Sequence, residues 1–152
     1  MQLLTDGMLP LIAGVLLAAV ILTILVLLHR RNRKHPVDMM EGHDFEYYCA
    51  DLLKAVGFAS VKVTTGSRDF GADILAERDG VTYAVQCKRY DHPVGVFAVQ
   101  EIYAARDYYD RMVGVVMTNA VFTEPARTMA EKLKILLWDR EDLKRMEGEI
   151  CT

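Results

Sequence analysis

The sequence predicts an α/β domain in which helices flank one mixed β-sheet, preceded by a single membrane-spanning helix. Helix-like and strand-like hydrophobic patterns alternate along residues 38–152, and Asp79-Gly80 separates two strand-like runs. Residues 8–28 form an uncharged run of 21 residues. Alternating helices and strands are typical of α/β folds, Asp-Gly is a strong hairpin signal, and the apolar run is long enough to cross a bilayer.

Residues 8–28 are expected to cross the membrane as one helix. At about 1.5 Å per residue this helix is about 30 Å long, close to the thickness of the hydrocarbon core. The run is too long for a cleaved signal peptide, and no basic residue precedes it. Four Lys and Arg residues lie in the linker 29–37, against none in the short extracytoplasmic terminus 1–7. The positive-inside rule therefore predicts a single-pass protein of the cell inner (cytoplasmic) membrane, with residues 38–152 in the cytoplasm.

The domain that follows the linker is acidic. The chain has 18 Lys and Arg and 21 Asp and Glu, and removing the four basic linker residues and Asp6 leaves 14 and 20, a net charge of −6. A nucleic-acid binder ordinarily presents a basic surface, so this balance argues against DNA as a partner. Cys49, Cys87 and Cys151 show neither zinc-ligand spacing nor the even number of a disulfide framework.

Hydrophobic periodicity places the elements of the domain in order. Apolar residues recur at helical spacing over 41–56 and 95–112. Further helices are expected after Thr123, where Glu124-Pro125 is typical of a first turn, and after Asp139. The expected strands are 61–63, 72–78, 81–88, 113–117 and 135–138, with a loop at 65–71. The predicted order is helix, three strands, helix, strand, helix, strand, helix.

The Asp79-Gly80 turn predicts the register of the hairpin. If these two residues form the turn, paired positions add up to 159, and Asp73 lies opposite Gln86. Opposed residues share one face, with Cβ atoms about 4.5–5.5 Å apart, and Lys88 lies on the face of Gln86. The hairpin thus gathers a carboxylate, an amide and an ammonium group beside a glycine-containing loop. A register error of one residue would send Asp73 to the other face.

This group of side chains suits a hard divalent cation. Carboxylate and amide oxygens, here from Asp73 and Gln86, are ligands that Mg²⁺ accepts, and Mn²⁺ is an alternative. The ion would acidify a bound water, which Lys88 could orient. Glu46 lies at the margin of the apolar stripe of the first helix, from which it could supply a further ligand. The competing interpretation is an exposed sheet face that carries ordinary polar residues.

These residues also resemble a known family. The chain resembles the Mrr-type catalytic domain of type IV restriction endonucleases. That domain is a branch of the PD-(D/E)xK nuclease superfamily. The residues that carry the resemblance are, in order, Glu46, Gly66-Ser67-Arg68-Asp69-Phe70-Gly71-Ala72-Asp73, Val85-Gln86-Cys87-Lys88-Arg89, Val94-Gly95-Val96, Thr118 and Phe122-Thr123. The resemblance covers residues 42–143 and implies a restriction-endonuclease-like fold and a metal-dependent endodeoxyribonuclease.

The resemblance assigns roles to four residues. It implies that Asp73 is the metal-binding acid, that Gln86 fills the second acidic position, and that Lys88 is the catalytic lysine. Glu46 would complete the site from the first helix and bind the metal together with Asp73 and Gln86. The membrane span and the acidic balance depart from the family pattern.

DNA contacts and the final choice of function rest on weaker signals. Arg68, Arg89 and Lys62 lie near the predicted site and could hold phosphates. Five tyrosines could stack on bases, but their helical spacing favours packing: Tyr47, Tyr48, Tyr103, Tyr108 and Tyr109.

Two hypotheses for the function remain. The first is a Mg²⁺-dependent DNA endonuclease that contacts the lipid bilayer through residues 8–28. The second is a non-catalytic, membrane-tethered module that uses a nuclease fold to bind DNA or a protein. Whether two chains pair as a homodimer stays open.

Overall fold

The computed structural model describes residues 14–25, 36–64 and 70–150. Contacts within the chain divide it into two units, residues 1–35 and 36–152. Residues 14–25 are helical. Within the described part of the chain, no helix is both long and apolar enough to cross a membrane. The ends of the predicted span and the basic cluster after it lie outside the described residues.

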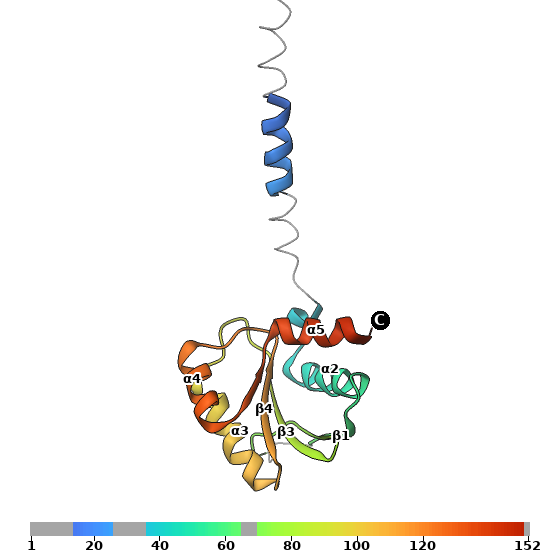
Figure 1. Ribbon diagram of the computed structural model, residues 1–152, viewed down its shortest axis with the longest axis vertical. Helices are drawn as coiled ribbons and strands as arrows, with labels where there is room; N and C mark the ends of the chain where they lie inside the picture. Colours follow the sequence, from blue (N-terminus) through green and yellow to red (C-terminus); the bar gives the residue numbers. More distant parts are fainter. Residues whose placement is uncertain (1–13, 26–35, 65–69, 151–152) are drawn as a thin grey trace, which may run out of the picture. The chain divides into compact units, whose positions relative to one another are not determined.

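The second unit is a five-stranded mixed sheet with helices on both faces (Figure 1). Its strands are β1 (Ala59–Val63), β2 (Ile74–Arg78), β3 (Val81–Lys88), β4 (Val113–Thr118) and β5 (Leu136–Trp138). Its helices are the short 3-10 helix η1 (Pro36–Met39), α2 (Gly42–Ala55), α3 (Val96–Tyr108), α4 (Glu124–Leu133) and α5 (Arg140–Ile150). The predicted order of elements is confirmed, with η1 as an addition.

The strands lie in the sheet in chain order. β1, β2 and β3 are antiparallel, whereas β3, β4 and β5 are parallel, so α3 and α4 are crossover connections. Neither edge of the sheet is long and regular: the pairing of β1 shifts between Ala59 and Lys62, and Ser60 has a φ of 54°. The other edge, β5, has three residues.

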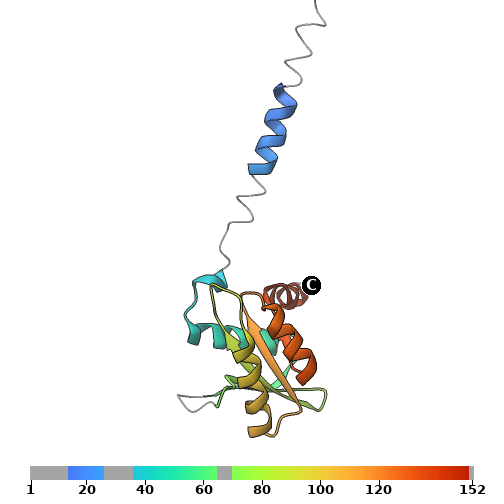
Figure 2. The ribbon, with the colours of Figure 1, turned by 90° about the vertical axis from the view of Figure 1, so that its left-hand side faces the viewer.

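Each face of the sheet packs against its own pair of helices. In Figures 1 and 2, α2 and α5 lie on one face, and α3 and α4 lie on the other. Phe45 and Leu53 of α2 are fully buried against the first face, and Val99 and Ile102 of α3 against the second. The competing interpretation assumed that the polar residues of β3 lie on an exposed sheet face. Because helices cover both faces, they do not.

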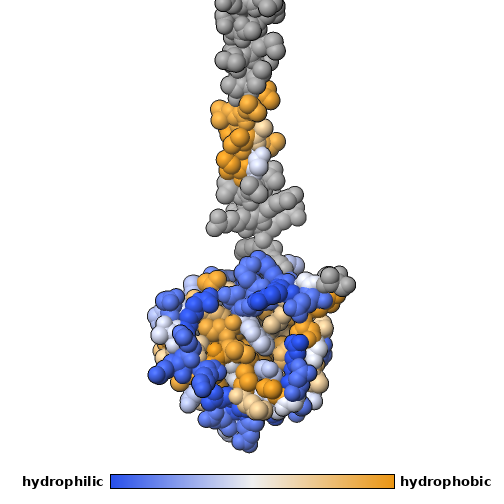
Figure 3. Space-filling view, viewed as in Figure 1, coloured by the Kyte–Doolittle hydropathy of each residue, from blue (hydrophilic) through white to orange (hydrophobic). Residues whose placement is uncertain are grey.

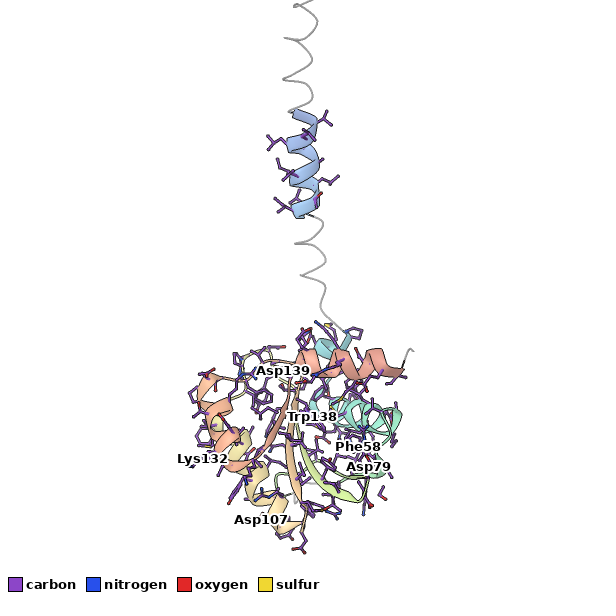
Figure 4. The ribbon with its side chains drawn as sticks, in the orientation of Figure 1. Phe58, Asp79, Asp107, Lys132, Trp138 and Asp139 are labelled. Atoms are coloured by element: carbon purple, nitrogen blue, oxygen red, sulfur yellow. The ribbon has the colours of Figure 1, made fainter. Side chains whose placement is uncertain are left out.

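The edge strand β5 adds aromatic packing to the first of these cores. Trp138 and Phe58 lie close together in Figure 4, with ring centroids 6.1 Å apart. Figure 3 shows apolar residues gathered in the middle of this view of the domain and hydrophilic residues around them. Leu136 of β5 is among the exposed apolar residues.

The predicted hairpin register is confirmed along β2 and β3. Pairs run from Arg78↔Val81 to Ile74↔Val85, and every pair adds up to 159. The turn residues Asp79-Gly80 both have positive φ, 53° and 78°, as a two-residue type I′ turn requires. Figure 4 places Asp79 at the tip of this hairpin.

Regular pairing ends just before Asp73, so its direct opposition to Gln86 is not formed. The backbone N–H of Asp73 donates to the carbonyl of Val85 at 2.8 Å, one position out of step with the ladder. Positive φ values at Phe70 and Gly71, 49° and 89°, turn the chain immediately before this point. Asp73 still enters the sheet beside the end of β3, which keeps it near the polar residues of that strand.

Candidate active site

A pocket of about 410 Å³ opens where β3 ends and β2 begins. Its lining residues are Phe70, Gly71, Asp73, Gln86, Lys88, Glu101 and Ala104. Three of the four predicted catalytic residues are therefore brought together. Glu101, which the sequence did not single out, lies among them.

The carboxylate of Asp73 is held by the backbone of the neighbouring strand. The N–H of Cys87 donates to Oδ2 of Asp73 at 2.6 Å. A hydrogen bond of this kind stabilises the ionised carboxylate. The thiol of Cys87 is itself buried: burial, a hydrogen bond with Cys49 and the charges of Cys49, Asp73 and Glu46 raise its pKa well above the usual value. Cys87 is thus a neutral, packed side chain without the thiolate of a nucleophile.

Gln86 is the buried amide at the centre of the pocket. Gln86 is only 3% exposed, and its Nε2 donates to Oε2 of Glu101 at 2.7 Å. Because a carboxylate only accepts hydrogen bonds, this contact fixes which end of the amide faces Glu101. The other end, Oε1, is buried and has no hydrogen-bond partner among the described residues. Such an oxygen is costly unless a further group binds it.

Lys88 is held at both its backbone and its side chain. Its Nζ lies 2.9 Å from Oε2 of Glu101, the same oxygen that Gln86 binds. Its carbonyl accepts a hydrogen bond from Oγ1 of the fully buried Thr118 at 2.6 Å. The sequence had given Thr118 no role, because a threonine at a strand end carries no signal of the carbonyl it binds.

Glu101 of α3 therefore holds two predicted catalytic residues through one oxygen atom. Burial alone would raise the pKa of Glu101, but hydrogen bonds from Lys88 and Gln86 and the charge of Lys88 outweigh burial and lower it. Glu101 is ionised at neutral pH. Gly71 packs against its backbone: a Cβ at Gly71 would lie 3.2 Å from the carbonyl oxygen of Glu101.

Glu46 is not brought into this pocket. It belongs to α2, which covers the opposite face of the sheet from α3, and it is absent from the pocket lining. Its Oε2 lies 3.0 Å from Nδ1 of His43, one turn earlier on the same helix. Its charge acts on Cys87, whose side chain points to the α2 face, so Glu46 approaches the site from behind the sheet.

The predicted DNA contacts are not gathered at the pocket either. Arg89 is largely buried; its guanidinium donates to the carbonyl of Asp38 and pairs with Asp91 at 3.1 Å. Lys62 is an exposed residue of the edge strand β1, outside the lining. Arg68 lies outside the described residues.

The start of the domain is fastened next to the end of β3. The carboxylate of Asp38 pairs with the guanidinium of Arg140 and accepts a hydrogen bond from Nδ2 of Asn119 at 3.0 Å. Oδ1 of Asn119 in turn accepts from the N–H of Tyr90 at 2.8 Å. This network ties η1 and α5 to the loop that follows Lys88.

Comparisons with known proteins identify the family. The family model for the Mrr catalytic domain, described as a restriction endonuclease, matches residues 37–147. The chain belongs to this family. A comparison with curated proteins gave no match. Membership makes this Mrr-type domain restriction-endonuclease-like.

Two solved structures share the fold of the Mrr-type domain. A protein of unknown function, AF1548, is 26% identical with a TM-score of 0.56, over 68% of this chain and 65% of that one. The DNA modification-dependent restriction endonuclease AspBHI is 18% identical with a TM-score of 0.57, over 81% of this chain and 33% of that one. The chain thus spans less than two thirds of the first protein and one third of the second.

The chemistry of the pocket fits a divalent metal ion held by few protein ligands. No group of three or more His, Cys, Asp and Glu side chains that could hold a metal occurs in the described part of the chain. The buried Oε1 of Gln86 is nevertheless an acceptor that a hydrogen-bond donor or a cation would satisfy, and the carboxylate of Asp73 lines the same pocket. Mg²⁺ keeps several waters and is usually bound by one or two carboxylates plus substrate phosphate oxygens, so two protein ligands suit it.

Proposed function

We propose that the chain is a membrane-anchored DNA endonuclease that uses Mg²⁺, or Mn²⁺ in its place, to hydrolyse phosphodiester bonds. The observation that carries the proposal is the buried Oε1 of Gln86, which has no partner among the described residues and lies in one pocket with Asp73 and Lys88. A cation would satisfy this oxygen, and the carboxylate of Asp73 would balance part of its charge.

The residues of the pocket divide the work of hydrolysis. A bound Mg²⁺ would supply a Lewis acid at the scissile phosphate and lower the pKa of a bound water. Asp73 and Gln86 would hold the ion through Oδ and Oε1 atoms. Lys88, the one cation of the described lining, would orient the attacking water and stabilise negative charge on the phosphate. Glu101 keeps the Lys88 ammonium at the pocket in the absence of substrate.

Glu46 has a conditional place in this scheme. It keeps its proposed role as a helix-borne acid only if its carboxylate leaves His43 and reaches around the end of β3 when metal and substrate bind. Its removal should therefore weaken cleavage less than removal of Asp73.

The membrane anchor is the second part of the proposal. Its support is the uncharged run 8–28, followed by the basic cluster, with no basic residue before it. The catalytic domain would then act on DNA at the cytoplasmic side of the membrane. Full-length protein should sediment with membranes and resist extraction at alkaline pH, whereas a chain that begins at Pro36 should be recovered in the supernatant.

A cleavage assay tests the catalytic part. The full chain in detergent micelles is incubated with plasmid, methylated and branched DNA, with and without Mg²⁺. We expect Mg²⁺-dependent cleavage that Asp73→Ala and Lys88→Ala abolish without changing the thermal unfolding midpoint by more than a few degrees. Lys132→Ala is the matched control, because this exposed lysine of α4 lies outside the pocket lining (Figure 4). Equal behaviour of the wild type and Lys88→Ala on every substrate would overturn the proposal.

The net charge of −6 favours one rival, a non-catalytic tethered module that binds DNA or a protein. The two functions differ in their response to metal. An ion bound only by the folded state raises its stability, so Mg²⁺ or Mn²⁺ should raise the unfolding temperature of the wild type and not that of Asp73→Ala. The rival predicts no shift in either protein.

The number of DNA strands that the protein cuts in one binding event depends on how many catalytic pockets act together. The described residues form one candidate catalytic pocket, and one pocket hydrolyses one strand at a time, so a monomer should nick plasmid DNA. Linear product should rise with protein concentration only if two chains pair as a homodimer on the substrate.

A further inference from the structure

Two exposed aromatic side chains stack on each other at the rim of the catalytic pocket. Phe70, part of the pocket lining, is 54% exposed, and Tyr108 of α3 is 58% exposed. Their ring centroids lie 4.1 Å apart, with planes inclined by 29°. Tyr109 packs edge-on against Tyr108, with ring centroids 5.0 Å apart. We call the rings of Phe70 and Tyr108 the aromatic platform.

The backbone at Phe70 is strained. Phe70 has a φ of 49°, in the left-handed region that bulky side chains rarely adopt. A phenylalanine at this position is therefore disfavoured twice, by its backbone and by the exposure of its ring to water. Strain at the rim of an active site is a reason to look for a function that the strained residue performs.

The acidic charge of the domain favours a mode of nucleic-acid binding that does not depend on basic side chains. The domain carries a net charge of −6, and Arg89 is occupied by Asp38 and Asp91. Lys88 is the one cation in the lining of the described pocket. Among the described residues of the site, few cations are therefore free to bind phosphates, whereas stacking of bases on aromatic rings needs no charge and accepts every base.

We propose that the aromatic platform binds a nucleobase adjacent to the scissile phosphate. This inference rests on the proposed function, because it takes the pocket beside Phe70 as the site of the phosphate. A base inside a duplex already stacks on both neighbours, so its face is free only when the nucleotide is unpaired or turned out of the helix. Because turning a base out of a duplex costs energy that an unpaired nucleotide does not require, the favoured substrate class is DNA with unpaired nucleotides at the cleavage point: a single strand, a flap or a branch.

The test measures stacking directly, apart from cleavage. Full-length protein in detergent, without divalent metal, is titrated into a single-stranded oligonucleotide that carries 2-aminopurine, whose fluorescence is quenched on stacking. We expect quenching by the wild type and about tenfold weaker binding by Phe70→Leu and Tyr108→Leu. Leucine keeps an apolar side chain and removes only the ring face. Phe97→Leu is the matched control, since Phe97 lies on α3, is 75% exposed and is outside the pocket lining.

Cleavage of three DNAs separates this inference from the proposed function. With Mg²⁺, Phe70→Leu should lose about tenfold on flap and single-stranded DNA relative to Phe97→Leu, and the wild type should prefer both to duplex. Loss of quenching in Phe70→Leu with no cleavage of any DNA by the wild type would keep the platform and overturn the nuclease. A different result would overturn the platform: the wild type cleaves DNA, and Phe70→Leu and Tyr108→Leu behave like Phe97→Leu in both assays. The two exposed rings would then be a candidate contact for a protein partner. Thermal unfolding of each variant shows that it is folded.

Discussion

Glu101 decides how Gln86 presents its amide. Because Nε2 of Gln86 donates to Glu101, the amide oxygen is the end that is left without a hydrogen-bond partner among the described residues, and in the proposed mechanism it is the end that binds the cation. A glutamate at position 86 would instead put two carboxylates within hydrogen-bonding distance of each other. The pair of a buried glutamine and a glutamate on α3 thus explains in physical terms why an amide stands where an acidic residue is usual in the superfamily.

An exchange of the two residues tests this pairing. Glu101→Gln should lower cleavage about 10-fold or more and raise the Mg²⁺ concentration needed, because the amide of Gln86 loses its orientation. Gln86→Glu should also lower activity, through repulsion between two carboxylates. The double variant Gln86→Glu/Glu101→Gln restores one carboxylate and one amide, and should recover metal binding measured by the thermal shift with Mn²⁺.

Additive losses in the double variant would contradict the pairing. Glu131→Gln is a suitable control, because Glu131 is an exposed residue of α4 outside the pocket lining.

The residues of the site could be predicted as far as local geometry reaches. Gln86 and Lys88 lie on a strand whose hairpin turn fixes its register, and Asp73 directly precedes the other strand, so the sequence could place the three near one another, although not Asp73 opposite Gln86. Glu101 could not be found in this way, because its approach depends on the path of α3 across the sheet. Glu46 was expected in the pocket because the sequence does not show which face of the sheet its helix covers. In the structure this helix packs on the face opposite α3.

At the scale of elements, the turn that leads into β2 can approach the backbone of α3 closely because Gly71 has no side chain. Gly71→Ala and Gly80→Ala both force an alanine into the left-handed region, at φ of 89° and 78°, and each should destabilise the fold by about 1–3 kcal/mol. Only at Gly71 would the new Cβ press on Glu101, since nothing lies within 4 Å at Gly80. Denaturant unfolding should therefore show similar losses of stability, and cleavage should fall about tenfold further in Gly71→Ala. Equal activity in the two variants would contradict this role.

The contact between β4 and the end of β3 is a second element-scale feature. Thr118→Val keeps the shape of the side chain but removes both the donor to the carbonyl of Lys88 and the acceptor of the N–H of Ala120 at 3.1 Å, and should lower the free energy of unfolding by about 1–3 kcal/mol. Thr128→Val removes a comparable hydrogen bond, to the carbonyl of Glu124, at an exposed position of α4. Its effect should stay within about 0.5 kcal/mol. Urea denaturation of both variants measures the difference, and equal losses would show that burial does not govern the effect.

At the scale of the whole molecule, acidity should govern how DNA binding responds to salt. Each phosphate neutralised on a single strand contributes about 0.7 to the slope of log affinity against log salt concentration. Since the domain carries −6 and Lys88 is the one cation lining the described pocket, we expect a slope smaller in magnitude than about 2. Fluorescence anisotropy of the full chain with a single-stranded oligonucleotide at several salt concentrations measures it. A slope as steep as about −5 would mean that basic residues elsewhere in the chain hold phosphates.

Most of the architecture could be predicted because local signals agree with the fold. The order of elements, the hairpin register and the cap at Thr123, whose Oγ1 accepts from the N–H of Ala126 at 3.3 Å, all follow from patterns within a few residues. The ends of elements were less accurate. α3 ends at Tyr108 instead of residue 112, because Asp110 turns the chain with a φ of 50°.

The two edges of the sheet limit how copies of this domain can associate. An open strand edge presents unpaired backbone donors and acceptors that can pair with the strand of another molecule. Here one edge is broken by the shifted pairing near Ser60 and the other is only three residues long. Neither edge offers a continuous row of backbone donors and acceptors to a neighbour. Two copies of the domain that associate would therefore do so through their helices and side chains, and their sheets would not join into one.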